Sequence, residues 1–234
     1  KEDDRTRTLK QVAAEKGKSF ARIIRRVFFH MLLGSTNSDL LPAVPNCPDG
    51  AAFASATDGD GADRFGLSGG NIETGGGVAS IAAVKTDFYS AIGRFLQFTN
   101  SGGRPVFDES IFDGGFIVYI NPANLEVFTE AFYGKMVPSI AGTASQDNSI
   151  SQKYQIELRP APEITDNDWF IFLRSVPEGK KPMVWTGARP VVETPFSKET
   201  GSDRARDFDV EGNAYDSRWG FGLGLPWAGV KCNN

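Results

Sequence analysis

Near the start of the chain, apolar residues repeat at the spacing of an α-helix. Between Arg5 and Met31 they fall three, four and seven residues apart, which predicts one long amphipathic helix, loosened near Gly17. The apolar positions are Leu9, Val12, Ala13, Phe20, Ile23, Ile24, Val27, Phe28 and Met31. The pattern stops at Gly34, and residues 34–77 are rich in Gly, Asp, Ser, Asn and Pro, which predicts a long loop or a set of short hairpins. A loop of this length inside a folded chain usually has a function.

The middle of the chain predicts two helices around one buried strand. The segment KTDFYSAIGRFLQFTN predicts a helix that is capped by Asp87 and buries Phe88, Ile92, Phe95 and Leu96. The run GFIVYI, Gly115–Ile120, is continuous and rich in β-branched residues, as in a central buried strand. A turn at Asn121–Pro122 then leads to a helix that ends at Gly134 and buries Leu125, Phe128, Ala131 and Phe132.

The last third of the chain predicts strands. YQIELR alternates apolar and polar residues, and DWFIFLRS and PMVWT are two further short apolar runs. From Trp219 to Leu225, every second residue is large and apolar, and the residues between are Gly220, Gly222 and Gly224. Helices and strands do not alternate regularly, so the predicted fold class is α+β.

Charge is distributed unevenly along the chain. The whole sequence has 25 Lys and Arg against 29 Asp and Glu, a net charge of -4, which gives no overall indication of nucleic-acid or anionic-membrane binding. Residues 1–30 hold nine basic and four acidic residues, a net charge of +5, so the remainder carries -9. This asymmetry suits contact between unlike surfaces of neighbouring copies, and a solvated basic helix face is the simpler alternative. The candidate contacts are Arg22, Arg25 and Arg26 on the helix and Asp58 and Asp60 in the acidic turn.

Two cysteines, Cys47 and Cys232, form neither a disulfide framework nor a metal-binding set, which favours a reducing compartment. No apolar run of ~20 residues is present, so no membrane span is expected. The start does not resemble a signal peptide. Because the first residue is lysine, we expect either upstream processing or a sequence that is part of a longer gene product.

Motifs of enzymes fail in their context. GLSGG, Gly66–Gly70, matches a nucleophile elbow around Ser68, but a Gly/Asp loop precedes it and the single histidine, His30, lies upstream on the first helix. In EKGKSF, the first glycine of a phosphate-binding loop is replaced by Val12.

Metal-binding and acid–base patterns fail as well. TDGDGAD has Ala62 where a calcium loop needs an oxygen ligand and Gly69 where it needs glutamate. The pairs Asp108–Glu109 and Asp207/Asp209 show no sign of a tuned acid–base couple. His30 is expected to pack against its neighbours or cap the helix. We therefore expect no catalytic residues, no cofactor, no metal site and no enzymatic activity.

The order of five segments resembles the major head subunit of Mu-like tailed phages, the T-protein family. The segments are the first helix, CPDGAAFASATDGDGADRFGLSGGN, GFIVYINPANLEVFTEAF, DWFIFLRS with KKPMVWTGARP, and GNAYDSRWGFGLGLPWAG. The resemblance covers roughly Thr6 to Gly229. It implies the capsid fold first described for the Hong Kong 97 phage. In it, residues 1–78 form a spine helix and extended loop in a peripheral domain, residues 79–165 form an axial domain, and residues 166–234 form returning strands that both domains share.

The sequence departs from that family in two places. The family's loop has two aromatic residues and a histidine after Asp-Gly, whereas here Ala51 comes first, Ala52 and Phe53 follow it, and no histidine is present. The family's N-terminal arm and extended hairpin, which clamp neighbouring subunits, should precede the spine helix. Their absence from this sequence implies cleavage, disorder or divergence.

The glycine-alternating strand fits a layered arrangement. Without side chains on one face, it lets another backbone approach closely, although each interior glycine costs roughly 0.5–1 kcal/mol relative to alanine. The second layer is either the first helix of the same chain, which we favour, or an arm of a neighbouring subunit. The candidate assembly contacts therefore also include four residues of this strand, Trp219, Gly220, Gly222 and Gly224.

The function implied by the resemblance is that of a major capsid protein, without enzymatic turnover. It would assemble with itself as pentamers and hexamers into an icosahedral shell around double-stranded DNA bound without sequence preference. A scaffold or maturation protease, a portal and decoration proteins are further implied partners. The expected location is the virion, with assembly in the host cytoplasm.

Three alternatives stay open. An encapsulin-type nanocompartment uses the same fold to enclose a cargo protein. A Ser68-dependent hydrolase belongs to a different class, and labelling of Ser68 by a fluorophosphonate would support it. A monomeric carbohydrate-binding or protein-binding module is the third alternative.

Overall fold

The computed structural model describes residues 22–36, 41, 43–138, 145–176, 181–196 and 212–234. The chain divides into two units. The first comprises residues 1–182 and 223–234, and the second is the segment Met183–Gly222.

The first unit is built on a mixed five-stranded sheet. Its strands are β1 (Ile72–Thr74), β9 (Gly229–Asn233), β6 (Trp169–Leu173), β2 (Phe116–Ile120) and β5 (Ile156–Pro160), in that order across the sheet. β6 is antiparallel to both of its neighbours, whereas β1 runs parallel to β9 and β2 parallel to β5. The α+β class is therefore confirmed. β2 and β5 are joined by a parallel crossover, and elsewhere helices and strands do not alternate regularly along the chain.

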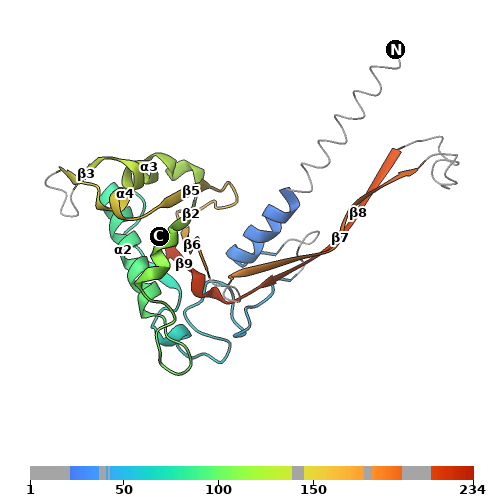
Figure 1. Ribbon diagram of the computed structural model, residues 1–234, viewed down its shortest axis with the longest axis horizontal. Helices are drawn as coiled ribbons and strands as arrows, with labels where there is room; N and C mark the ends of the chain where they lie inside the picture. Colours follow the sequence, from blue (N-terminus) through green and yellow to red (C-terminus); the bar gives the residue numbers. More distant parts are fainter. Residues whose placement is uncertain (1–21, 37–40, 42, 139–144, 177–180, 197–211) are drawn as a thin grey trace, which may run out of the picture. The chain divides into compact units, whose positions relative to one another are not determined.

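Helices α2 (Ile81–Gln97) and α3 (Leu125–Tyr133) cover one face of this sheet (Figure 1). The crossover from β2 passes through the short helix η3 (Pro122–Asn124), α3, the hairpin strands β3 (Met136–Pro138) and β4 (Ser145–Asp147), and α4 (Ser149–Lys153). The core beneath the helices is aromatic: the Phe88 ring lies 5.5 Å from the Phe116 ring and 5.2 Å from that of Phe132. Such tilted and edge-to-face pairs stabilise the core beyond the area they bury. The predicted strand at Gly115–Ile120 and the predicted helix end at Gly134 are confirmed.

Helix α2 begins earlier than its sequence pattern indicated. Ser80 is the N-cap, and its hydroxyl oxygen accepts a hydrogen bond from the Ala83 N–H at 3.2 Å. Asp87 therefore lies inside the helix, and the prediction that it caps the helix is wrong. The earlier start is favoured because Ile81 and Val84 continue the same apolar face, with Val84 fully buried.

Two leucines that we expected in the core lie at its margin instead. Leu96 is 39% exposed and Leu125 is 40% exposed. Each sits at the end of a helix, where one step along the turn rotates a side chain away from the sheet.

The opposite face of the sheet carries the first helix, which the described residues show over 22–33. Its Phe28 and Phe29 rings lie 5.7 Å and 5.4 Å from the ring of Tyr119 on β2. Phe28 also packs on Phe172 of β6, at 6.5 Å between ring centroids. The amphipathic helix is confirmed over these residues, and its predicted part from Arg5 to Ala21 lies outside the described residues.

The predicted loop after this helix is only partly irregular. It contains a short 3-10 helix η1 (Arg64–Gly66) and the strand β1, which pairs with the last strand of the chain, β9. Two further 3-10 helices follow: η2 (Glu109–Gly114) before β2 and η4 (Pro226–Ala228) before β9. The sequence pattern indicated neither β1 nor β9, because three and five residues are too few for a periodic pattern to stand out.

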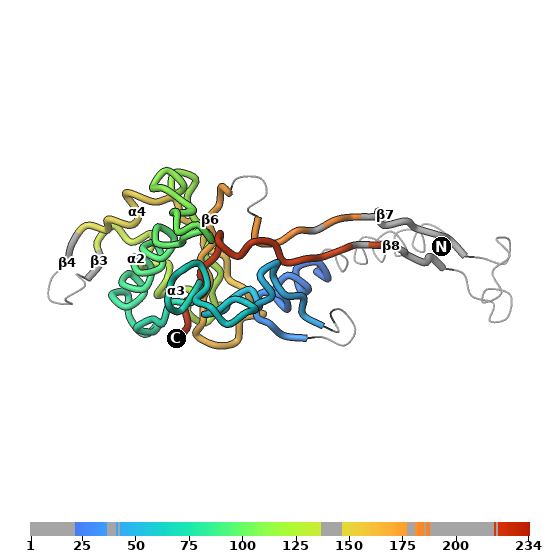
Figure 2. The backbone as a smooth tube through the Cα atoms, turned by 90° about the horizontal axis from the view of Figure 1, so that it is seen from below, coloured from blue at the N-terminus to red at the C-terminus, as the bar shows by residue number. Residues whose placement is uncertain are grey.

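The second unit is a two-stranded ribbon. β7 (Met183–Phe196) and β8 (Gly212–Leu223) pair with each other as a sheet of their own, and Figure 2 shows the two running side by side. The predicted strand PMVWT lies in β7 from Met183 onward, and the predicted strand Trp219–Leu225 lies in β8 as far as Leu223. β7 continues to Phe196, and β8 already begins at Gly212. The final strand prediction ends two residues too late, since β8 stops at Leu223.

Candidate functional site

The ribbon is the first candidate for an interaction surface. In the part of the chain that the structure describes, no third strand pairs with β7 or β8, so each strand has one edge that no other described strand covers. Val184 on β7 is 49% exposed, and Thr186, Gly187, Arg218 and Gly220 are exposed as well. A ribbon of this kind gains little stability from itself.

The three predicted glycines of the ribbon and its base differ in their surroundings. A Cβ on Gly222 would meet no atom of a described residue within 4 Å, and one on Gly220 would lie 2.8 Å from the Thr186 hydroxyl oxygen of the facing strand. At Gly224, a Cβ would overlap the carbonyl oxygen of Lys181, and the Gly224 N–H donates to the Pro182 carbonyl at 2.9 Å. Among the described residues, backbone lies close to the position of a Cβ at Gly224 but not at Gly220 or Gly222, and that backbone belongs to Lys181 and Pro182, just before β7. The side chain of Trp219 lies outside the described residues.

The basic face of the first helix is the second candidate. Arg22 and Arg26 are exposed, in line with a solvated face. Arg25 is engaged within the chain: its Nε lies 3.1 Å from Glu163 Oε1, and its guanidinium lies 5.5 Å from the Phe29 ring centroid. Among the described residues, no ion pair joins these arginines to Asp58 or Asp60.

The acidic loop is organised by a buried arginine that the sequence analysis did not single out. Arg64 is 1% exposed, and its guanidinium donates to Asp49 at 2.6 and 2.9 Å. Nη1 also donates to the carbonyls of Ala52 and Phe53 at 2.8 and 2.7 Å. Asn71 continues the network, because its Nδ2 donates to the carbonyls of Phe53 and Gly229. Together these bonds fasten the loop to the last strand of the sheet.

Asp58 and Asp60 both lie on this loop, as predicted, in a tight turn. Asp58 Oδ1 accepts hydrogen bonds from the N–H groups of Asp60 at 3.0 Å and Ala62 at 2.9 Å. Asp58 also lines a cavity of about 250 Å³ with Asp63, Phe65 and Trp227, whereas Asp60 is exposed outside it. Within the described residues, no three His, Cys, Asp or Glu side chains are placed to hold a metal ion.

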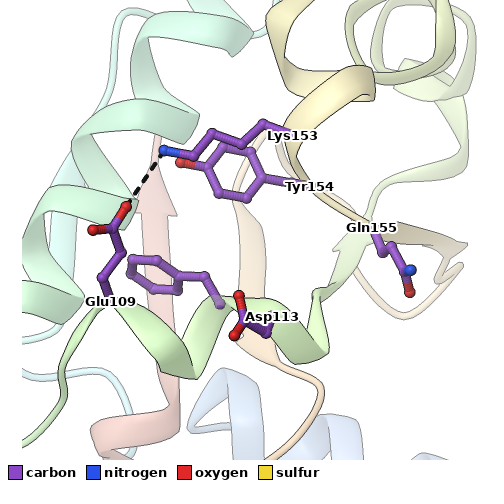
Figure 3. Close-up of a pocket in the computed structure, with 6 residues that line it drawn as sticks. Glu109, Asp113, Lys153, Tyr154 and Gln155 are labelled. Carbon is purple, nitrogen blue, oxygen red and sulfur yellow. Dashed lines mark ion pairs between the residues drawn. The ribbon is translucent and has the colours of Figure 1, made fainter.

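A second hollow, of about 210 Å³, lies between η2 and α4 (Figure 3). Lys153 Nζ lies 3.6 Å from Glu109 Oε1 and 5.3 Å from the Tyr154 ring centroid. The contact with Tyr154, and to a smaller extent Glu109, raises the pKa of Lys153 above its usual value. Asp113 lines the same hollow, and Gln155 points away from the ion pair. A protonated lysine in a salt bridge is neither a nucleophile nor a base, so this hollow has no evident chemistry.

The enzyme motifs lack their required context in the structure too. Ser68 is exposed in a turn that leads to strand β1, whereas a nucleophile elbow requires a strand before the serine and a helix after it. His30 Nδ1 lies 2.9 Å from the hydroxyl of Ser35 near the end of the first helix, where a packing or capping role was expected. Burial raises the pKa of both thiols, Cys47 and Cys232, which removes them as reactive thiolates.

Helix α2 contributes two buried charged groups. Burial lowers the pKa of Lys85 and raises the pKa of Asp87. Asp87 Oδ1 accepts from the Gly76 N–H at 2.8 Å, while Asp87 Oδ2 and Lys85 Nζ have no hydrogen-bond partner among the described residues. No sequence signal distinguished these residues from exposed helix positions.

No helix in the described part of the chain has both the length and the apolar content needed to cross a membrane.

Comparison with known proteins gives a structural likeness only. No protein family model matches the chain, and no curated protein matches it. A virus-like particle from Pyrococcus furiosus is similar in structure at 14% identity, over 70% of this chain and 54% of that chain, with a TM-score of 0.38. A structure titled Mycobacterium phage Che8 is similar at 13% identity, over 70% of this chain and 53% of that chain, with a TM-score of 0.41. The chain thus spans about half the length of these structures.

Proposed function

We propose that this chain is the subunit of a closed protein shell, the major capsid protein of a tailed phage or prophage head. The observation that carries the proposal is the ribbon Met183–Gly222, which forms a unit apart from the five-stranded sheet and its helices. A two-stranded ribbon is only marginally stable in water without further packing. A chain that keeps such a ribbon is best explained by a partner that covers it.

Copies of the same chain are the simplest partner. Heterologous contacts, in which one surface meets a different surface of the next copy, close into rings when the rotation between copies allows it. Rings of five and six copies then build a shell in which many weak contacts add up. The edges of β7 and β8 suit such contacts, because a strand of a neighbouring copy can pair along an edge that no other described strand covers.

The distribution of charge supports the same arrangement. Residues 1–30 carry +5 and the rest of the chain -9. Opposite charges on unlike surfaces favour the correct approach of two copies and exclude wrong ones. Arg22 and Arg26 are exposed and suited to this contact, while Arg25 already pairs with Glu163 in its own chain.

The finer features of the proposal are those that the sequence resemblance implies. They are membership of the Mu-like head subunits, the Hong Kong 97-type architecture with its peripheral, axial and returning segments, packaged double-stranded DNA, and the associated protease, portal and decoration proteins. A compartment that encloses a cargo protein would be built from the same subunit geometry, and the contents of the particle distinguish the two.

Electron microscopy of the purified chain tests the proposal. The wild type should form rings or closed particles as its concentration increases, and the ratio of absorbance at 260 to 280 nm reports whether nucleic acid or protein is enclosed. A variant in which residues 184–221 are replaced by a short Gly-Ser linker should stay monomeric, because the ribbon is missing. Its circular dichroism should still show the folded first unit, since the Pro182–Gly224 hydrogen bond lies outside the deletion.

Two outcomes would contradict the proposal. In one, the wild type remains a monomer of 25.4 kDa at every concentration and ionic strength tested. In the other, the variant without the ribbon assembles as readily as the wild type. Labelling of Ser68 by a fluorophosphonate probe would instead revive the hydrolase alternative.

A further inference from the structure

We propose that the cavity beside Asp58, Asp63, Phe65 and Trp227 is the docking site for residues 5–21 of a second copy of this chain. The inference deepens the proposed function and rests on it, because it names the surface through which one subunit holds the next.

The cavity combines apolar walls with an acidic rim. Its volume of about 250 Å³ is enough for a long side chain together with part of its neighbours. Phe65 comes from η1, Trp227 and Pro226 from η4, and Thr99 and Asn100 from the turn after α2. Apolar walls favour the methylene stem of a lysine or arginine, and carboxylates at the rim favour its charged end.

The rim keeps a net negative charge. Arg64, the one basic residue among the described residues that line the cavity, is paired with Asp49 and buried, so their charges cancel. Asp58 and Asp63 take part in no ion pair with another described residue. The Asp58 carboxylate is also fixed in orientation by the two backbone N–H groups that it accepts from. Two carboxylates are therefore present where a cation can approach.

The aromatic wall is held rigidly. Phe65 has φ 63° and ψ 21°, a left-handed conformation that costs on the order of 1–3 kcal/mol for a residue with a side chain. Thr99 holds it there, since its N–H and hydroxyl donate to the Phe65 carbonyl at 2.9 and 2.8 Å. The Phe65 ring packs on Phe98 at 4.9 Å and on Trp227 at 6.1 Å between centroids. The cavity is thus formed before any ligand arrives, which lowers the entropic cost of binding.

Residues 5–21 match this cavity in composition. They contain five basic residues and one acidic residue, Glu15, a net charge of +4. The basic residues are Arg5, Arg7, Lys10, Lys16 and Lys18, and Leu9, Val12 and Phe20 lie between them. Residues 22–33 are anchored on the subunit's own sheet, so the segment before them starts from a fixed point. In a shell, every subunit would present one such segment and one such cavity, as a heterologous contact requires.

The first test compares two charge variants of the full chain. Asp58→Asn combined with Asp63→Lys removes the acidic rim, while the amide introduced at position 58 retains an oxygen that accepts the turn's hydrogen bonds. The control, Asp60→Asn combined with Asp113→Lys, changes the charge by the same +3 outside the cavity. We expect the rim variant to need at least about tenfold more protein before particles appear, a change of about 1.4 kcal/mol per contact. The control should stay within about twofold of wild type, and equal behaviour of the two variants would overturn the inference.

The second test shows which copy supplies the segment. Carbodiimide treatment of particles assembled from equal amounts of ¹⁴N and ¹⁵N chains should join Asp58 or Asp63 to Lys10, Lys16 or Lys18 in mixed-label pairs. Pairs of one label alone would place the segment in its own subunit and overturn the inference, as would the absence of these links.

A third measurement separates this inference from the proposed function. A fluorescent peptide of residues 5–21 should bind the wild-type chain at low salt, bind the rim variant at least tenfold more weakly, and bind the control normally. If the wild type never assembles, the proposed function fails, and the peptide still decides whether the cavity binds this segment. If the wild type assembles but the peptide binds both variants equally, the docking inference alone fails.

Discussion

At the scale of single residues, the chain buries charge in two different ways. Arg64 is buried with its counter-ion Asp49 and with two carbonyl acceptors, so its desolvation is compensated by charge-assisted hydrogen bonds. Asp87 is buried with only one oxygen hydrogen-bonded, and its pKa is raised by burial. The first arrangement stabilises the loop, and the second makes stability depend on pH.

Replacing Arg64 tests the first arrangement. Arg64→Met keeps much of the stem but leaves Asp49 without its partner and two carbonyls without a donor, so we expect a loss of about 3 kcal/mol in the free energy of unfolding. Urea denaturation measures this directly. The control is Arg159→Met, which breaks the exposed pair with Glu157 and should cost less than about 1 kcal/mol. Equal losses in the two variants would show that the buried network stabilises the fold no more than an exposed ion pair does.

Asp87→Asn tests the second arrangement. A carboxyl whose pKa is higher in the folded than in the unfolded state binds more protons when folded, so it lowers stability as pH rises from about 4 past its folded pKa. The asparagine side chain retains an acceptor for the Gly76 N–H but cannot ionise. Relative to wild type, the variant should therefore become more stable as pH rises from 4 to 7, in urea titrations at several pH values. A difference that is constant with pH, or that falls with it, would contradict the raised pKa.

At the scale of elements, the glycine-alternating strand shows how one pattern can have several causes. Gly222 has no described atom near the position of a Cβ, Gly220 has the Thr186 hydroxyl there, and Gly224 has the Lys181 carbonyl oxygen there. The pattern alone predicts close approach at all three positions. Among the described residues, backbone from another segment, at Lys181, lies close enough to require a glycine only at Gly224.

Two alanine variants separate these causes. Gly224→Ala should destabilise the chain by about 1–3 kcal/mol, because the new Cβ must displace the backbone at Lys181. Gly222→Ala should be neutral or stabilising by up to about 1 kcal/mol, because a strand interior loses less entropy with alanine than with glycine. Thermal unfolding of both variants gives the comparison. If Gly222→Ala were the more damaging of the two, the assignment of the close approach would be wrong.

At the scale of the whole molecule, the two units should differ in stability. The first unit buries a continuous aromatic core between its sheet and helices, and the ribbon is two strands without a third among the described residues. Local opening of such a ribbon needs far less free energy than opening of a buried strand. In the proposed shell, the ribbon would be buried against other copies. That burial would stabilise the ribbon and so remove the difference in stability between the two units.

Hydrogen exchange measures the difference. In the monomer, backbone amides of residues 183–187 and 218–222 should exchange on the order of a hundredfold faster than those of β2, β6 and β9. In assembled particles the ribbon amides should become protected, while those of the sheet change little. Ribbon amides that are already as protected as β6 in the monomer would argue against a surface that awaits a partner.

Much of the fold could be predicted from the sequence. Local periodicity and turn residues act over a few positions, and they were enough to predict three elements. These are the strand at Phe116–Ile120, the helix that ends at Gly134, and the helical face that carries Val27 and Met31. The short strands β1 and β9 could not be predicted, because three to five residues carry too little pattern and their pairing joins positions that are far apart in the sequence. The sequence analysis pointed to one residue that lines the candidate cavity. Asp58 was singled out for its charge, whereas the roles of Asp63, Phe65 and Trp227 depend on the packing of η1 against η4.

By itself, the sequence determined the α+β class, the amphipathic first helix, the buried central strand and the separation of basic and acidic segments, since each depends on residue type and local spacing. Only the tertiary structure decided that the last strand lies inside the sheet, that Arg64 is buried while Arg22 is exposed, and that Asp58 borders a cavity with an aromatic wall. The physical reason is that burial and pairing depend on which distant segments meet. That meeting is set by the packing of the whole unit and leaves no periodic signal at any one position.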